Sequence, residues 1–189
     1  MHLLPLTKSL NISAFDQLLL RAVLLVAYHG CLRVGEVLLS PKADHAIKIS
    51  NVFFPPSPNP SHVSLILHSY KHSRGNKPIS LSKAEDYHFC PVAALTNYLV
   101  QRPSADGPLF IHSSGAPATR AFLVHNLKSL LSAGGIDPSQ YNTHSLRVGR
   151  ATDLALGGVP DHVIRETGRW SSNAYLGYIR FALAPLPPA

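Results

Sequence analysis

The segment of residues 14–30, AFDQLLLRAVLLVAYHG, limits most strongly what this chain can fold into. Its apolar residues recur with the spacing of an α-helix over about four turns, and Ser13 is a suitable N-cap in front of it. Arg21 interrupts the longest apolar run, at residues 17–28, so the run falls short of the roughly 18 residues that suggest a membrane span. We therefore predict a long helix within one globular domain, which suits a chain of 189 residues.

The charge balance favours an anionic partner. Seventeen Lys and Arg residues stand against ten Asp and Glu, which leaves a net charge of +7 with the eleven histidines neutral. Such a charge places a positive field on the surface, but it does not tell nucleic acid from an acidic protein or lipid. The two cysteines, Cys31 and Cys90, cannot build a disulfide scaffold, and no secretory signal is visible, so a reducing compartment is expected.

The rest of the chain predicts a mainly helical α+β domain. Alternating apolar and polar residues predict strands over 46–54, 62–70 and 77–81, with the basic turn KHSRGNK between the last two. Gly30 is expected to end the first helix, and Thr143 to cap a later one. Further helices are predicted over 32–40, 91–101, 119–135, 144–158, 160–168 and 171–182. The order of helices, small sheet and helices is typical of an α+β fold.

Three groups of polar residues could carry chemistry. His144 and Arg147 lie three positions apart, so both emerge on one helix face and could grip an anion. Lys71, near the hairpin tip, could protonate a leaving group. Arg33 and Glu36 share a face of the short second helix. Each group taken alone is also explained by a solvated surface, either a polar helix face or a hairpin tip.

Metal and nucleotide sites are not predicted. His68 and His72 are four apart on a strand and turn, where that spacing does not converge, and the sequence has no CxxC or HExxH motif. It also has no GxxxxGK[ST] or GxGxxG loop and no GxSxG elbow. The segment GRWSSNAYLGYIR (168–180) instead carries two tyrosines, Tyr175 and Tyr178, which core packing alone would explain.

The order of these motifs resembles the catalytic domain of the tyrosine recombinases, also called phage integrases. The resemblance covers about residues 5 to 180. It looks most like the integrases of DIRS-type retroelements and related eukaryotic tyrosine-recombinase transposons. It implies that residues 1–183 form that domain, with a small antiparallel three-stranded sheet, before a proline-rich tail at 184–189. The motifs that carry it are LRVGEV with Arg33, SYKHSRG with Lys71, HSLR with His144 and Arg147, GRW, and YIR with Tyr178.

The resemblance implies a role for each of these residues. The Tyr178 phenol would attack a DNA phosphodiester and form a 3′-phosphotyrosyl intermediate, with no cofactor and no metal ion. Arg33 and Arg147 would stabilise the charge of the transition state. Lys71, with Lys77 and Arg74 as alternatives, would be the general acid for the leaving 5′-oxygen. His144 would assist proton transfer, and Glu36 fits the acidic position after the first arginine as a supporting residue.

One active-site position stays open between two neighbours. The family usually has His or Trp just after a glycine near the nucleophile, and here Gly168 is followed by Arg169 and Trp170. The spacing to Tyr178 favours Arg169, whereas an indole N–H that can donate to a phosphate oxygen favours Trp170. We take Trp170 as the expected residue and Arg169 as its alternative.

The resemblance also implies the partners. Double-stranded DNA is expected, with assembly into a tetramer on it and no membrane contact. The protein would be intracellular, in the nucleus if eukaryotic and in the cytoplasm or nucleoid if bacterial. No room exists before residue 13 for the family's N-terminal core-binding domain, so its absence is expected. Two alternatives remain: DNA relaxation of the type IB topoisomerase kind, and a catalytically inactive DNA-binding remnant of a mobile element.

Overall fold

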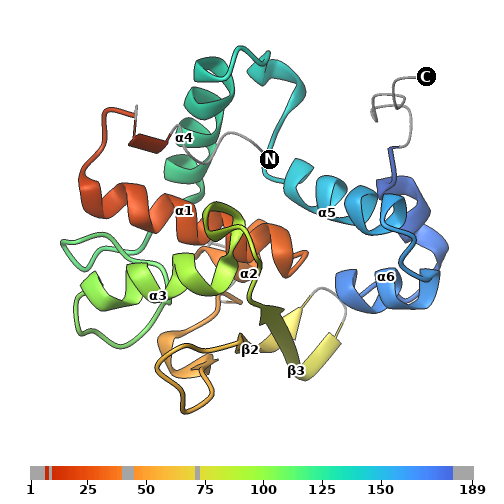
Figure 1. Cartoon of the computed structure of the whole chain (residues 1–189), viewed down its shortest axis with the longest axis horizontal. Coiled ribbons are helices and arrows are strands. Elements are labelled where there is room, and N and C mark those ends of the chain that lie inside the picture. The colour runs from red at the N-terminus through yellow and green to blue at the C-terminus, as the bar shows by residue number, and fades with distance from the viewer. Residues whose placement is uncertain (1–6, 9, 40–44, 71–72, 181–189) are drawn as a thin grey trace.

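The computed structural model describes residues 7–8, 10–39, 45–70 and 73–180. The prediction of a mainly helical α+β fold with a small antiparallel three-stranded sheet is confirmed (Figure 1). The α-helices are α1 (Ala14–His29), α2 (Val34–Val37), α3 (Pro91–Gln101), α4 (Arg120–Ala133), α5 (Ser145–Leu156) and α6 (Asp161–Gly168). The strands are β1 (Val52–Phe53), β2 (His62–Tyr70) and β3 (Ser73–Ser82), and the 3-10 helices include η2 (Ile49–Asn51), η3 (Tyr87–Phe89), η4 (Pro138–Gln140) and η5 (Asn173–Tyr178).

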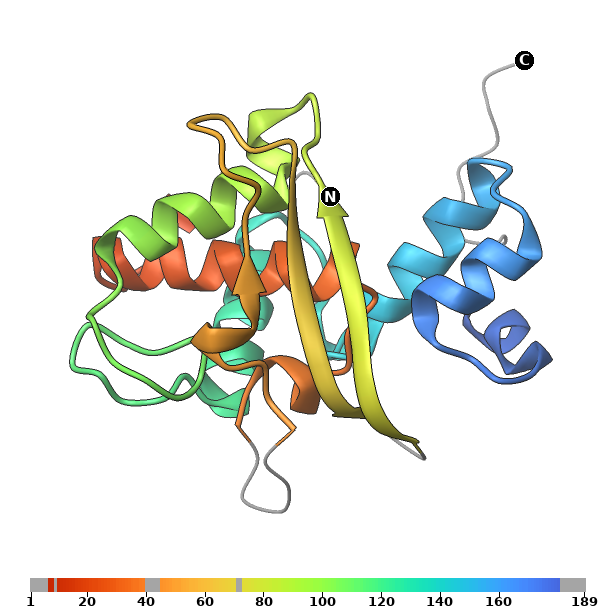
Figure 2. The same ribbon diagram turned by 90° about the horizontal axis from the view of Figure 1, so that it is seen from below.

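Helix α1 forms the centre of the hydrophobic core. Ser13 caps it by accepting a hydrogen bond from the Asp16 N–H at 3.0 Å, as predicted. Its buried residues lie on nearly every side of its second half, because α3, α4 and α5 all pack against it (Figure 2). Gly30 ends the helix, and a Cβ there would lie 3.0 Å from both the Val26 carbonyl oxygen and the Leu32 side chain. A side chain at this position would have to displace the Leu32 side chain or the Val26 carbonyl, so the exit towards α2 favours glycine.

The sheet differs from the prediction at both of its edges. Strand β2 lies between β1 and β3, with Val52 opposite Leu65 and Val63 opposite Leu81. The predicted strand over 46–54 was wrong for most of its length, because only Val52–Phe53 pair with β2. The residues before them pair with other parts of the chain: the Ile47 N–H donates to the Glu36 carbonyl at 2.9 Å, and Lys48 bridges to Pro108.

Strand β3 starts earlier than predicted, at Ser73 instead of residue 77. A bulge between Leu67 and Ser69 and a positive φ of 136° at Gly75 let the hairpin continue through the predicted basic turn. Lys71 and His72 at the tip lie outside the described residues.

The helices after the sheet lie close to their predicted positions, with two corrections. His144 occupies the N-cap position of α5, and Thr143 in front of it is buried. The predicted helix over 171–182 was wrong: residues 173–178 form the short 3-10 helix η5. The Thr152 hydroxyl of α5 binds the Tyr178 carbonyl and the Arg180 N–H at 3.4 and 3.1 Å, which draws these groups away from a helical ladder.

Helices α5 and α6 and η5 form a C-terminal unit at one end of the molecule (Figure 2). Ala151, Ile164 and Tyr175, one from each element, are buried apolar residues outside the large core around α1, whereas Leu146 at the start of α5 belongs to that core. Among the helices described, none is both long and apolar enough to cross a bilayer. The contacts between this unit and the end of α1 shape the candidate site.

Candidate active site

Tyr178, at the end of η5, lies in the middle of a cluster of predicted site residues. The centroid of its ring is 4.8 Å from the centroids of both the His144 and the Trp170 rings. The guanidinium carbon of Arg147 lies over the same ring at 5.6 Å. His144 and Arg147 come from the start of α5, and Trp170 comes from the segment that joins α6 to η5. Four residues that the sequence marked are therefore brought together by three elements.

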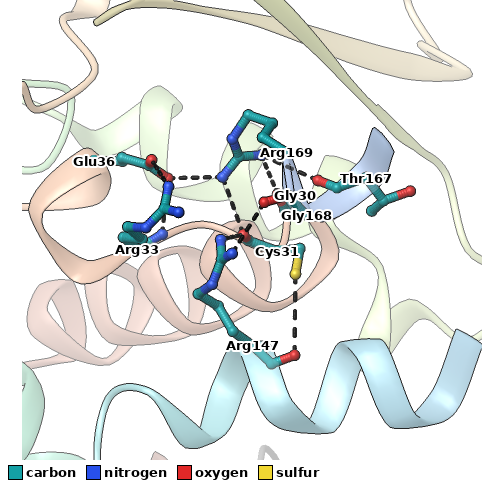
Figure 3. Close-up of polar contacts among 8 residues, drawn as sticks. All are labelled: Gly30, Cys31, Arg33, Glu36, Arg147, Thr167, Gly168 and Arg169. Atoms are coloured by element: carbon teal, nitrogen blue, oxygen red, sulfur yellow. Dashed lines mark hydrogen bonds and ion pairs between the residues drawn. The ribbon is translucent and has the colours of Figure 1, made fainter. Parts of the chain in front are cut away.

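Arg147 is the most buried charged residue of the cluster, with 1% of its surface exposed. Its guanidinium donates to the carbonyl oxygens of Cys31 and of Gly168, the latter at 3.0 Å (Figure 3). Burial, above all, lowers its pKa below the usual arginine value. Trp170 covers one side of it, with 4.8 Å between the guanidinium carbon and the ring centroid. The Arg147 guanidinium is thus enclosed by two carbonyl oxygens and by the Trp170 and Tyr178 rings.

Arg33 and Glu36 form a paired unit at the start of α2. The Arg33 Nη1 lies 2.9 Å from Glu36 Oε1, and the Arg33 backbone N–H donates to Glu36 Oε2 at 2.8 Å. The Arg33 side chain is 29% exposed, whereas the Glu36 side chain is 4% exposed. The charge of Arg33 contributes to lowering the pKa values of both His144 and Arg147, so the three side chains are electrostatically coupled.

Arg169 lies on the other side of Glu36. Its Nη2 donates to Glu36 Oε2 at 2.8 Å and to the Cys31 carbonyl at 3.1 Å. Its Nη1 donates to the carbonyls of Gly30 and Thr167, each at 3.1 Å (Figure 3). The Arg169 side chain is 2% exposed, so this is a buried ion pair. Arg169 and its neighbour Trp170 thus lie in different places: one against α2, the other against Tyr178.

The cluster carries an excess of positive charge. Arg33, Arg147 and Arg169 bring three guanidinium groups, and within the described ranges Glu36 is the one carboxylate that forms ion pairs with them. Charges removed from water are stable in proteins when an opposite charge or strong hydrogen bonds compensate them. Carbonyl oxygens meet part of this need at Arg147 and Arg169. The arrangement is chemically suited to receive an anion beside Tyr178.

His144 lies at the exposed edge of the cluster. Desolvation is the main cause that lowers its pKa, and the positive charges of Arg147, Arg33 and Arg180 act in the same direction. The imidazole is therefore neutral at neutral pH, with one ring nitrogen that accepts a proton and one that donates. A neutral histidine next to a phenol can take up the phenolic proton.

The other predicted site residues are placed differently or not at all. Lys71 lies outside the described residues, as does the side chain of its alternative Arg74. The second alternative, Lys77, is paired with α6, where its Nζ lies 3.6 Å from Glu166 Oε1. Tyr175 is 2% exposed, and a hydrogen bond to Asp161 raises its pKa, so its ring fills the core of the C-terminal unit.

Sequence reasoning missed two residues that shape the site. Thr152 holds the backbone of Tyr178 and Arg180 through its hydroxyl. Cys31 has a positive φ of 46°, and its carbonyl accepts hydrogen bonds from both Arg147 and Arg169. Neither had a distinct signal in the sequence, because a threonine within a helix and a cysteine among apolar residues are both ordinary. Among the described residues, no group of three or more His, Cys, Asp or Glu side chains could hold a metal ion.

Comparison with known proteins bears on the fold. The sequence matches no family model, and the search among curated proteins found no match. Solved structures match well. The XerH site-specific recombinase bound to palindromic difH substrate has a TM-score of 0.71 and 17% identity, over 95% of this chain and 46% of that one.

Two other recombinase structures give the same result. The XerA recombinase has a TM-score of 0.67 and 20% identity, over 95% of this chain and 56% of that one. The Tn1549 transposon integrase in complex with circular intermediate DNA has a TM-score of 0.57 and 18% identity, over 94% and 57%. This chain spans about half the length of these three structures, from 46% to 57%. It has the tyrosine recombinase catalytic-domain fold.

Proposed function

We propose that this chain is a tyrosine recombinase catalytic domain that cleaves and rejoins DNA strands through a 3′-phosphotyrosyl intermediate. One observation carries the proposal: the Tyr178 ring contacts His144, Trp170 and Arg147 beside guanidinium groups that outnumber their carboxylate partner. A phenol next to an excess of positive charge is suited to attack a phosphodiester, whose transition state carries extra negative charge. The recombinase fold supports the same chemistry.

In the proposed reaction the Tyr178 oxygen forms a bond to phosphorus as the bond to the 5′-oxygen breaks. The neutral His144 takes the phenolic proton, and the leaving 5′-oxygen takes one from a general acid, for which Lys71 remains the candidate. Arg33 and Arg147 bind the non-bridging oxygens. Trp170 would add its indole N–H, which is buried and has no partner among the described residues. Attack by a 5′-hydroxyl of another strand reverses the step and restores Tyr178.

The finer assignments belong to the same proposal. The partner is double-stranded DNA, and the active assembly is a homotetramer on it. The matched Tn1549 integrase, in complex with circular intermediate DNA, and the matched XerH recombinase, bound to its difH substrate, support a DNA partner. The wording of the motifs supports a DIRS-type or related eukaryotic mobile element, and hence integration of that element. The protein would then act in the nucleus, or in the cytoplasm or nucleoid if its source is bacterial.

A suicide substrate tests the proposal. The protein is incubated with a nicked duplex that loses its 5′-hydroxyl fragment after cleavage, and the covalent adduct is detected by denaturing gel. We expect an adduct with the wild type and with Tyr175→Phe, and none with Tyr178→Phe. The phenylalanine keeps the ring that contacts His144 and Trp170, so loss of the adduct would be due to the missing hydroxyl.

The same assay separates the alternatives. An adduct that rejoins only its own strand and relaxes supercoiled plasmid would indicate topoisomerase activity, whereas exchange between two labelled duplexes indicates recombination. Binding to duplex without any adduct over a library of sequences would indicate an inactive remnant. Absence of salt-dependent DNA binding would overturn the whole proposal, because phosphate contacts make affinity fall steeply with salt.

A further inference from the structure

Arg169 occupies the sequence position that, by spacing, is the one expected to contact phosphate, but its terminal nitrogens are fully engaged. A guanidinium has two N–H groups on each Nη, and here four acceptors match these four groups at 2.8 to 3.1 Å. Only Nε is left, and it is buried without a partner among the described residues. Arg169 cannot bind a phosphate oxygen through its fork without giving up its contacts to Glu36 or to the end of α1.

The backbone at Arg169 explains why Trp170 takes the position beside Tyr178. Arg169 has a left-handed conformation, with φ 57° and ψ 43°, which residues other than glycine adopt at a cost. The chain reverses there, since the Trp170 N–H donates to the Arg165 carbonyl at 2.9 Å. The Trp170 ring then packs directly against Gly168, where an added Cβ would lie 1.7 Å from a ring carbon.

Glu36 connects this turn to Arg33, the partly exposed arginine of the site. One of its oxygens, Oε1, binds Arg33 Nη1 at 2.9 Å, and the other, Oε2, binds Arg169 Nη2 at 2.8 Å. A shift of Arg169 would therefore change the positions of both Arg33 and Trp170. Because the Trp170 ring contacts the Tyr178 ring, it would also affect Tyr178. Buried ion pairs of this kind hold their geometry because the cost of separating them in the interior is high.

We infer that Arg169 is a positioning residue: through Glu36 and the Gly30 and Cys31 carbonyls it fixes Trp170 against Tyr178 and Arg33 towards the substrate, and it does not contact DNA. The inference rests on the proposed function for its consequence in catalysis. Its structural part stands without that function, because the placement of Trp170 can be measured in the absence of DNA.

Trp170 is the only tryptophan among 189 residues, so intrinsic fluorescence reports on it directly. We expect Arg169→Gly, which tolerates the left-handed backbone but lacks the guanidinium, to shift the emission to the red and to increase quenching by acrylamide. Glu36→Gln should act in the same direction, and the double variant should add little beyond Arg169→Gly, because both changes break one pair.

Arg102 offers a matched control. It too is held by backbone carbonyls, those of Pro103, Ala105, Pro108 and Leu109, but it lies after α3, away from Trp170. Arg102→Ala should leave the emission and the quenching of the folded protein unchanged. If Arg169→Gly does not fold, Arg169→Lys keeps the positive charge without the planar fork, and we expect a smaller change in the same direction.

The catalytic consequence is measured with the suicide duplex. At saturating DNA we expect Arg169→Gly to slow adduct formation about 10²-fold, the order that a small misplacement of catalytic groups costs, while the Kd for duplex changes little. An unchanged fluorescence signal in folded Arg169→Gly, or a weaker Kd with an unchanged rate, would overturn the inference. If even the wild type forms no adduct, the proposed function fails, and fluorescence still decides whether Arg169 positions Trp170.

Discussion

Two regions of the molecule depend on different kinds of contact. One is the interior of the body around α1, and the other is the junction between that body and the C-terminal unit of α5, α6 and η5. Around α1, apolar side chains from α3, α4 and the sheet form one continuous core. Towards the C-terminal unit, many of the contacts are polar. Tyr28 donates to Asp153, Arg147 and Arg169 donate to the carbonyls at the end of α1, and Lys77 pairs with Glu166.

This difference means that the apolar core around α1 provides most of the stability, whereas the polar junction sets the orientation of the unit that carries Tyr178. Apolar packing is non-directional and tolerates many arrangements, whereas hydrogen bonds and ion pairs fix distances and angles. The unit that carries Tyr178 is thus oriented by groups with a defined geometry. These contacts are also sensitive to the loss of single hydrogen bonds, on which the apolar core does not depend.

The largest expected effect on stability comes from the core. Leu24→Ala removes a side chain that is 1% exposed in the middle of α1, and we expect a loss of about 2–5 kcal/mol in the free energy of unfolding. Urea denaturation followed by circular dichroism measures it. Val100→Ala is the control, because that side chain is 80% exposed and its removal should cost close to nothing. Similar losses for the two variants would contradict the assignment of the core.

An intermediate effect is expected where His29 meets the C-terminal unit. Burial, with the charge of Arg150 on α5 adding to it, lowers the pKa of His29 from 6.5 to about 4. Between pH 6.5 and 4 the unfolded state therefore binds a proton at His29 that the folded state does not bind. The contribution of the neutral, buried His29 to stability is fully present above pH 6.5 and is lost as the pH falls towards 4. We expect the free energy of unfolding to fall by about 2–3 kcal/mol over this pH range, a value reduced from the full pKa shift because His29 is partly exposed.

His29→Gln tests this pH dependence. The His29 Nε2 lies 2.9 Å from the Phe89 carbonyl, and glutamine can also donate a hydrogen bond there but does not titrate in this range. Chemical denaturation of both proteins between pH 7 and pH 4 should show a shallower loss of stability in the variant. Some slope should remain, because the pKa of His144 is lowered too and acts with the same sign. Parallel curves would show that His29 does not contribute.

The smallest effect is expected at the contact between α5 and η5. Thr152→Val keeps the shape of the side chain but removes the hydroxyl that binds the Tyr178 carbonyl and the Arg180 N–H. We expect a local loss of about 1 kcal/mol, seen as faster hydrogen exchange at the Arg180 amide. Thr167→Val is the control, because its hydroxyl donates to the Val163 carbonyl within α6 and thus does not hold η5. Equal exchange in the two variants would mean that Thr152 does not hold η5.

Much of the fold could be predicted because its signals are local. The apolar periodicity of α1, the Ser13 cap and Pro91 at the start of α3 act within one or two turns, and these elements lie where predicted. The strand over 46–54 failed because alternation predicts an extended backbone but not its partner, and Ile47 binds the carbonyl of Glu36 in α2 instead of a strand. The helix over 171–182 failed because Thr152, a residue distant in sequence, binds the backbone of Tyr178 and Arg180.

For the candidate site, too, some features could be predicted from the sequence and others could not. The sequence by itself determined which residues with chemical capacity are present and in what order, from Arg33 to Tyr178, because motif order depends only on the chain. It also determined the excess of basic residues. It could not decide between Arg169 and Trp170, since spacing and donor chemistry pointed to different neighbours.

Only the tertiary structure shows where each of these two side chains lies. A left-handed turn at Arg169 sends two adjacent side chains to opposite partners: the guanidinium to Glu36 and the indole to Tyr178. The physical reason is that the buried carboxylate of Glu36 and the carbonyls of Gly30 and Cys31 provide three of the four acceptors of the Arg169 guanidinium. Those acceptors are 133 to 139 positions away from Arg169 in the sequence. They surround its guanidinium only after α6 has packed next to the end of α1.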